Sequence, residues 1–276
     1  IGLTNQGHLP NEFFTVYRPE GENTILPCTW HQVGISFWGR TDNWKYEAIF
    51  TSGLNADQFG NESFVHYGAA SPYEFKVANN YAGVLRIDNY SISGLRLGLS
   101  GYAGPTFENS LSKNTKYKDC KGTLVIGAFD FQYKNEKIVA RGYADYAHLS
   151  DAYEIGLWNR ETFATKYDDS PSKRQYIGSD AVALSLSIGS YLVHRKKSEN
   201  ALLVFGHYEY YNSFLKGKLS DTYQWCGKHR IALGLNYMPM KDIVVKAEYS
   251  KRFLKSQYNN EPSISMSIAY SGFFQY

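Results

Sequence analysis

Alternation of apolar and polar residues is the feature that most constrains how this 276-residue chain can fold. From Ser263 to Tyr276, aliphatic or aromatic residues occupy nearly every second position and small polar residues the positions between, with Phe273 as an exception. Successive side chains of a strand point to opposite faces of a sheet, so this stretch predicts a strand with one apolar face. Similar stretches predict further strands at about 30–40, 44–54, 81–90, 95–104, 122–133, 137–148, 181–192, 201–212, 230–237 and 243–252.

The connections between these predicted strands alternate in length. Short turns are predicted at 41–43, 91–94, 135–136, 196–200 and 239–241, longer connections at 55–80, 105–120, 149–179 and 213–227, and a modest loop at 257–260. Barrels of bacterial outer membranes gather short turns on one rim and long loops on the other, whereas a Greek-key sandwich has no reason to do so. Most predicted strands also reach about ten residues, enough to cross a bilayer when tilted. The patterns predict an all-β fold, an antiparallel transmembrane β-barrel.

Composition agrees with a barrel. Aromatic residues make up 16% of the chain, which favours β-structure. Five of them lie near predicted strand ends, where barrels carry interfacial girdles: Trp44, Tyr81, Tyr133, Tyr237 and Tyr276. Mean hydropathy is −0.42, and no apolar run reaches the ~18 residues of a membrane helix. A net charge of +3 gives no reason to expect a nucleic-acid partner.

Motifs that would indicate catalysis are absent from the sequence. It contains no HExxH, nucleophile elbow, P-loop or GxGxxG, so we predict no enzyme, no cofactor and no metal site. His207 and His229 fall on neighbouring predicted strands, but two imidazoles without a carboxylate are weak evidence for a metal site. Cys28, Cys120 and Cys226 are widely spaced and are expected to be small unpaired residues, with one disulfide as the alternative.

Residues 10–38 carry a family resemblance. The residues that carry it are Glu12, Arg18-Pro19, Leu26-Pro27, Thr29-Trp30 and Gly34. In this order they resemble the phosphate-selective porin O and P family. The resemblance implies about sixteen strands and a loop that folds inward to narrow the pore. Phosphate selectivity is not carried over, because it needs clustered lysines and the loop at 6–28 contains none.

About twelve strands are expected in this chain, counting a remnant at 1–6, and an even number suits this class of barrel. Residues 1–276 are therefore expected to form a single outer-membrane domain that lacks about four N-terminal strands. The final Tyr276 resembles the aromatic C-terminal signal of bacterial outer-membrane proteins. That resemblance places the C-terminus in the periplasm and the long loops outside the cell.

Candidate functional residues are those expected to face the lumen. The loop around 11–27 is expected to fold into the barrel, and its charged residues form the candidate constriction: Glu12, Arg18, Glu20 and Glu22. The strand residues assigned inward by alternation form the candidate pore lining: Arg40, Lys45, Glu47, Arg86, Asp88, Arg96, Asp130, Arg141, Asp145, Glu209, Arg230, Lys246, Glu248 and Arg252. These charges either set ion selectivity or pair across strands to hold the wall.

Three functions stay open at this stage. The first is a porin for passive diffusion of small hydrophilic or ionic solutes, which the resemblance supports. The second is an accessory or structural β-barrel subunit of an outer-membrane complex. The third is an outer-membrane enzyme, whose catalytic residues need not be close in sequence. Expected partners are outer-membrane lipid, lipopolysaccharide and small solutes, with copies of the chain or other outer-membrane proteins as further partners.

Overall fold

The computed structural model describes residues 1–7, 9–69, 79–109, 117–163, 176–194, 200–240, 242–255 and 260–272. These form one antiparallel sheet of eleven strands, each paired with its neighbour in sequence. The strands are β1 (Gly34–Arg40), β2 (Trp44–Ser52), β3 (Tyr81–Asn89), β4 (Leu95–Pro105), β5 (Thr123–Lys134), β6 (Ile138–Leu149), β7 (Asp180–His194), β8 (Ala201–Lys216), β9 (Gly227–Met240), β10 (Ile243–Leu254) and β11 (Glu261–Tyr270). The eleven strands predicted from alternation are confirmed, in the predicted order.

One prediction about the sheet is wrong. Residues 1–6 are not a strand, so the described chain has eleven strands and not twelve. The backbone N–H groups of Leu3 and Thr4 donate to the Glu22 carboxylate, at 2.5 and 2.6 Å, and not to a neighbouring strand. The described sheet is also not closed, because β1 pairs only with β2 and β11 only with β10. With an odd number of strands β1 and β11 run in the same direction, so no antiparallel ladder can join them.

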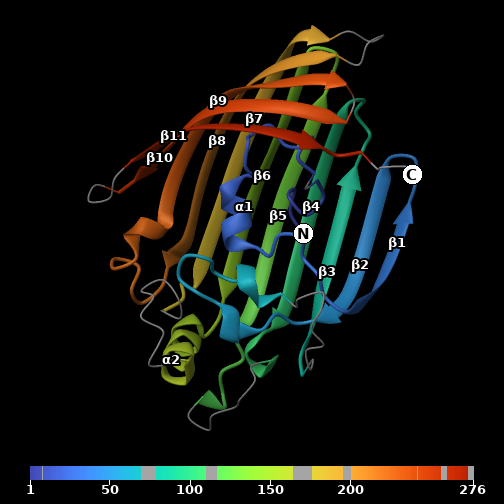
Figure 1. Cartoon of the computed structure of the whole chain (residues 1–276). Coiled ribbons are helices and arrows are strands. Elements are labelled where there is room, and N and C mark those ends of the chain that lie inside the picture. Colours follow the sequence, from blue (N-terminus) through green and yellow to red (C-terminus); the bar gives the residue numbers. More distant parts are fainter. Residues whose placement is uncertain are drawn as a thin grey trace.

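The sheet has a short-turn end and a long-loop end. The connections at 41–43, 90–94 and 135–137 are short, and the long connections after β2, β4 and β6 begin at the opposite end. The long-loop end carries the short helices α2 (Ala152–Phe163), η1 (Ala56–Gln58), η2 (His66–Gly68), η3 (Phe107–Asn109) and η5 (Gln224–Cys226). In Figure 1 this end is at the bottom of the view.

Helix α2 was not predicted, because it falls in the longest predicted loop. Its Trp158 is buried and donates through Nε1 to Asp57 Oδ1 at 3.1 Å, and Asn159 donates to the Ala56 carbonyl at 3.0 Å. These bonds join two long connections into one cap at the long-loop end. None of the described helices is long and apolar enough to cross a bilayer.

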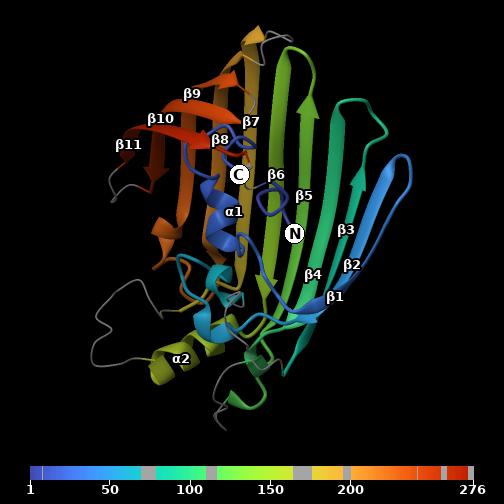
Figure 2. The ribbon, with the colours of Figure 1, turned by 45° about the vertical axis from the view of Figure 1, so that its right-hand side comes forward.

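The sheet curls around the N-terminal segment, which we define as residues 1–30. Figures 1 and 2 both show this blue segment in the hollow, with the short helix α1 (Glu20–Ile25) beside the strands. Helix α1 packs against β7 and β8. The faces of the sheet therefore differ: the concave face meets the N-terminal segment, and the convex face meets the surroundings.

Candidate functional site

The N-terminal segment is anchored to the wall mainly through its own backbone. The Gly21 N–H donates to Glu209 Oε2 at 2.9 Å, and the Glu22 N–H lies 3.0 Å from the Tyr143 hydroxyl. The Lys246 ammonium donates to the carbonyls of Phe13 and Thr15, at 2.6 and 2.9 Å. Backbone groups cannot pair inside a hollow without such partners, so these contacts hold the segment in one place.

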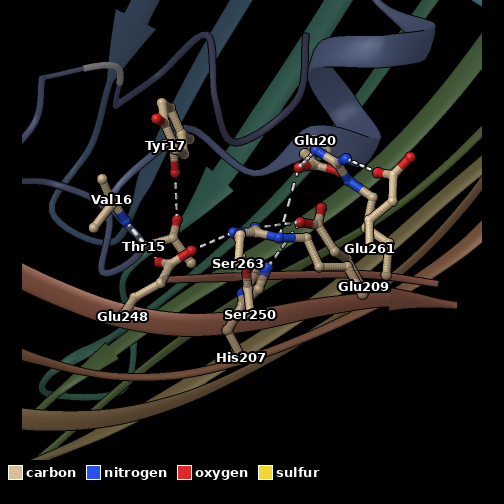
Figure 3. Close-up of polar contacts among 12 residues, drawn as sticks. Thr15, Val16, Tyr17, Glu20, His207, Glu209, Glu248, Ser250, Glu261 and Ser263 are labelled. Carbon is tan, nitrogen blue, oxygen red and sulfur yellow. Dashed lines mark hydrogen bonds and ion pairs between the residues drawn. The ribbon is translucent and has the colours of Figure 1, made fainter. Parts of the chain in front are cut away.

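A charged network fixes α1 to the last strands, and Figure 3 shows it beside the helix. Arg230 pairs with Glu209 at 3.0 Å and with Glu248, and its Nε lies 3.6 Å from Glu20. Arg252 holds Glu20 with two nitrogens, at 2.6 and 2.7 Å. Glu209, Arg230 and Glu248 are almost fully buried, so each charge depends on its partners.

The charged network lowers the pKa of Glu20 on α1. Burial alone would raise its pKa, but hydrogen bonds from Arg252 and from the Tyr211 hydroxyl, at 2.7 Å, lower the pKa overall. Glu20 therefore stays ionised and keeps α1 attached to β8 and β10. Arg252 also pairs with Glu261 on β11, and the Val16 N–H donates to Glu248 at 2.7 Å.

A second charged network crosses β3, β4 and β5. Arg86 and Arg96 each pair with both Asp88 and Asp130, at 2.6 to 2.9 Å. Gly98 lies between them on β4, and a Cβ at this position would stand 2.4 Å from Arg86 Nη2. Only glycine therefore leaves room for the guanidinium at this point of the wall.

Removing one member of this network should destabilise the fold strongly. We expect Arg86→Met to lower the free energy of unfolding by about 3–5 kcal/mol, because Asp88 and Asp130 would lose a buried cation. Thermal or denaturant unfolding in detergent would measure this. Arg40→Met is the matched control, since Arg40 is exposed near the Tyr90 ring. Equal stability of the two variants would contradict the assigned role.

Ser187, His207 and Glu209 form a buried polar row. Ser187 Oγ lies 2.7 Å from His207 Nδ1, and His207 Nε2 lies 3.0 Å from Glu209. This order matches a serine-hydrolase triad, but His207 Nε2 makes no well-aligned hydrogen bond. Glu209 is also engaged by Arg230 and by Gly21 under the N-terminal segment. These contacts connect the row to the charged network and to the N-terminal segment.

The histidine pair does not form a metal site. His207 lies on the concave face, whereas His229 stacks on Tyr210, 4.6 Å between ring centroids, with the outward-facing residues. The described residues hold no group of three or more potential metal ligands. The cysteines are unpaired, as expected, and burial raises the pKa of the Cys28 thiol.

Two acids meet between α1 and the wall. Glu22 is fully buried, and its carboxylate accepts from Leu3 and Thr4. Asp145 on β6 faces it, and no N–H or O–H donor of the described protein reaches either Asp145 oxygen. Burial raises the pKa of Glu22 to about 7, although the two N–H groups oppose this. A hydrogen bond between two carboxyl groups requires a proton on one of them.

The predicted constriction residues divide into two groups. Glu20 and Glu22 lie in the hollow and serve as anchors of α1. Arg18 is half-buried just before α1, and the exposed Glu12 accepts from the Leu9 N–H at 2.9 Å. The position of the segment agrees with the expected inward fold, and its role in narrowing a pore stays a prediction.

The predicted lining residues of β3–β10 lie on the concave face. Most of them pair with one another or with the N-terminal segment, as the two networks show. Arg141 differs, because its Nη1 has no hydrogen-bond partner among the described residues. Lys45 and Glu47 are half-buried on β2, and Arg40 is exposed on the edge strand. Alternation could place these residues on one face, but it missed Tyr143, Tyr211 and Glu261 as partners.

Comparisons with known proteins find distant similarity. No family model matches the sequence. An uncharacterized protein of Aquifex aeolicus is 24% identical over 271 residues, which cover 95% of this chain and 58% of that protein. This chain therefore spans 58% of the length of the curated relative that it matches.

Several solved structures are weakly similar to this chain. A porin refined at 1.8 Å has a TM-score of 0.45 at 10% identity, covering 84% of this chain and 60% of the porin. A bacterial polysaccharide outer-membrane secretin has 0.41 at 9% identity, covering 87% and 69%. LpxR from Salmonella typhimurium has 0.32 at 8% identity, covering 86% and 87%. These scores are too low to assign a function.

Proposed function

We propose that this chain forms most of the wall of a bacterial outer-membrane β-barrel that passes small hydrophilic or ionic solutes. The observation that carries the proposal is the contrast between the two faces of the sheet. Charged groups occupy the concave face, while the middle of the convex face is aliphatic. A soluble sheet would place these faces the other way around, with its charges toward water.

The convex face has the properties of a lipid-facing surface. Leu99 and Leu233 are each at least 60% exposed, and no charged residue interrupts the outward positions in the middle of β3–β10. Other exposed aliphatic residues on this face are Leu85, Ile87, Val125, Leu184, Leu186, Ile188, Ile231 and Leu235. An exposed apolar band of this extent in water would cause aggregation; in a bilayer it is the stable arrangement.

Aromatic residues lie toward both ends of this band. Tyr237 is exposed near the short-turn end, and Tyr146, Tyr208 and Tyr249 are exposed nearer the long-loop end. Tyrosine rings suit the membrane interface, because the ring is buried while the hydroxyl stays in water. The predicted Trp44 and Tyr81 are also exposed, at the first residues of β2 and β3, so the expected girdle has candidates at both rims. Tyr276 lies outside the described residues.

A solute path would run along the concave face. Its charged side chains suit water and small ions, and the N-terminal segment would narrow the path. The dense anchoring of that segment favours a second candidate, an accessory barrel subunit whose hollow stays filled. Conductance of purified full-length protein in planar bilayers separates the two: discrete channels support the porin, and a membrane-inserted but silent protein supports the accessory subunit.

A charge on the convex face should prevent assembly. We expect Leu186→Arg to cost about 2–4 kcal/mol of folding free energy in lipid, because it places a cation near the membrane midplane. Ser185→Arg is the matched control one residue away, since Ser185 lies on the concave side opposite Glu209. Refolding into vesicles, followed by gel mobility, would measure both. If the two variants refolded alike, the lipid-facing assignment would be wrong.

A further inference from the structure

A cavity of about 400 Å³ lies between the N-terminal segment and the concave face of β2, β3 and β4. Three of the residues that line it, Ile49, Val84 and Tyr102, lie opposite one another across the three strands. Each is a few residues from the long-loop end of its strand. The volume falls within the range of about 300–1,000 Å³ that small-molecule sites occupy. The cavity lies on the path that the proposed function assigns to solutes.

The lining of this cavity carries no acidic or basic side chain apart from the imidazole of His31. None of the eleven described residues that form it is Asp, Glu, Lys or Arg. Two residues along β3 from Val84, by contrast, Arg86 already belongs to the charged network with Asp88 and Asp130. An ion that entered the cavity would lose its water without gaining a countercharge, which is costly. The lining therefore favours an uncharged solute.

Trp30 gives the cavity an aromatic wall. Its ring lies 5.3 Å from the Tyr102 ring, between centroids, at an interplanar angle of 38°. The Trp30 N–H donates to Asn5 Oδ1 at 3.0 Å, and the Asn5 amide donates to two further backbone carbonyls of the segment, at 3.0 and 2.9 Å. Thr29, just before the indole, has a φ of +56°, which a β-branched residue adopts only where its surroundings impose it. The segment therefore holds the indole in place before a solute arrives.

Three polar groups beside the indole are available to a solute. Gln32 Oε1 accepts from the Ser52 hydroxyl at 2.7 Å, which leaves the Gln32 Nε2 group without a partner among the described contacts. The side-chain amide of Gln6 and Trp30 Nε1 are also without a partner there. Each of the three can donate to a hydroxyl oxygen, and the Gln6 amide oxygen can accept. A purely apolar solute would displace water from these groups and leave them unpaired.

We infer that this cavity binds a neutral sugar ring. The indole of Trp30 lies against one face of the ring, and the amides of Gln6 and Gln32 bind its hydroxyl groups. A pyranose matches the lining, because its C–H groups form an apolar face and its hydroxyl groups surround that face. Apolar contact and hydrogen bonds therefore form together. The inference rests on the proposed function and adds a solute class and the residues that recognise it.

The test is a titration of the full-length protein in lipid nanodiscs with D-glucose, D-galactose and D-mannose, followed by saturation-transfer NMR. We expect at least one of these hexoses to bind saturably. D-Glucuronate and D-glucosamine are the matched charged probes, and both should bind at least about tenfold more weakly, because the lining offers neither charge a partner. If none of the three hexoses bound, or if a charged probe bound as well as the neutral sugars, the inference would be overturned.

Variants locate the site. Trp30→Ala should weaken hexose binding about tenfold, whereas Trp30→Phe should retain most of it because a ring remains. Trp44→Ala is the matched control, since Trp44 is exposed at the short-turn end of β2. Gln6 is exposed, so Gln6→Ala should keep the fold and weaken binding about threefold. Unchanged binding in Trp30→Ala, or in Gln6→Ala if Trp30→Ala does not assemble, would contradict the assigned site.

Planar-bilayer recordings separate this inference from the proposed function. Discrete channels formed by a protein that binds no hexose would overturn the sugar site alone. Hexose binding to a membrane-inserted protein that forms no channels would support the site and overturn the diffusion function.

Discussion

Replacing residues 12–24 with a short Gly-Ser linker should raise the single-channel conductance several-fold. The replaced residues include all of α1 but Ile25. They also include the rings of Phe13 and Phe14, which pack against Lys246 and Phe205 in the hollow. Removing them widens the water-filled path. The wall should survive the change, because Glu209, Arg230 and Glu248 still pair with one another. Planar-bilayer recordings of the full-length protein and the variant measure the effect.

A reducible disulfide between α1 and β7 provides the control. An ideal Cβ on Gly21 would lie 3.2 Å from the Ala183 Cβ, close to the ~3.5–4.5 Å spacing of a disulfide. Gly21→Cys with Ala183→Cys, in a background with Cys28, Cys120 and Cys226 changed to serine, should fasten α1 to β7 without raising the conductance, and a reductant should return the variant to the conductance of the unmodified protein. If the linker variant inserts and its conductance is unchanged, the segment does not limit the path, and the accessory-subunit function gains support.

The strands could be predicted from the sequence because their signal is local. A period of two over about ten residues identifies a strand and its faces, and this was enough to place Arg86, Glu209 and Lys246 on one side. The same reasoning failed for residues 1–6. Their apolar and polar residues resemble a short strand, but Glu22 takes the N–H groups that a strand partner would need.

The partners within the hollow could not be predicted. Glu20 and Arg252 are 232 residues apart in sequence, and only the curvature of the whole sheet brings them to 2.6 Å. The expected inward fold of the loop around 11–27 placed Glu20 in the barrel but gave no strand or register for its partner. Of the four candidate constriction residues, Glu20 and Glu22 anchor the segment, together with the backbone around Thr15. The face on which a strand residue lies is determined by its neighbours in sequence, whereas a contact across the barrel depends on the fold of the whole sheet.

The second prediction with a large effect is that docking of the N-terminal segment depends on pH through Glu22. The pKa of the fully buried Glu22 carboxyl group is raised from 4.5 to about 7. Docking of the N-terminal segment is therefore linked to proton uptake, and the shift corresponds to about 3 kcal/mol of docking free energy. The docked state is fully stabilised below the ordinary pKa of 4.5 and loses this stabilisation as the pH rises through about 7. The segment should therefore be held at acidic pH and loosened at alkaline pH.

The groups that face Glu22 explain why it cannot ionise freely. Asp145 and Asp130 repel its charge. Arg86 is engaged by its two acid partners, Asp88 and Asp130. Arg141 acts on Glu22 only at a distance. Among the described contacts, neither Arg86 nor Arg141 donates a hydrogen bond to Glu22. Binding a proton is therefore the most favourable way to neutralise the Glu22–Asp145 pair.

Amide hydrogen exchange of the N-terminal segment, corrected for the intrinsic effect of pH, should accelerate between pH about 6 and about 8.5, and conductance should rise over the same range. Glu22→Gln and Asp145→Asn should each abolish this dependence and keep the segment docked, because an amide can donate to the remaining carboxylate without a shared proton. Glu154→Gln is the matched control, since that acid is exposed on α2 and pairs with Lys218 outside the hollow. A Glu22→Gln variant with the same pH profile as the unmodified protein would show that this carboxyl pair does not control docking; a flat profile in the unmodified protein would show that the segment stays in place at every pH tested.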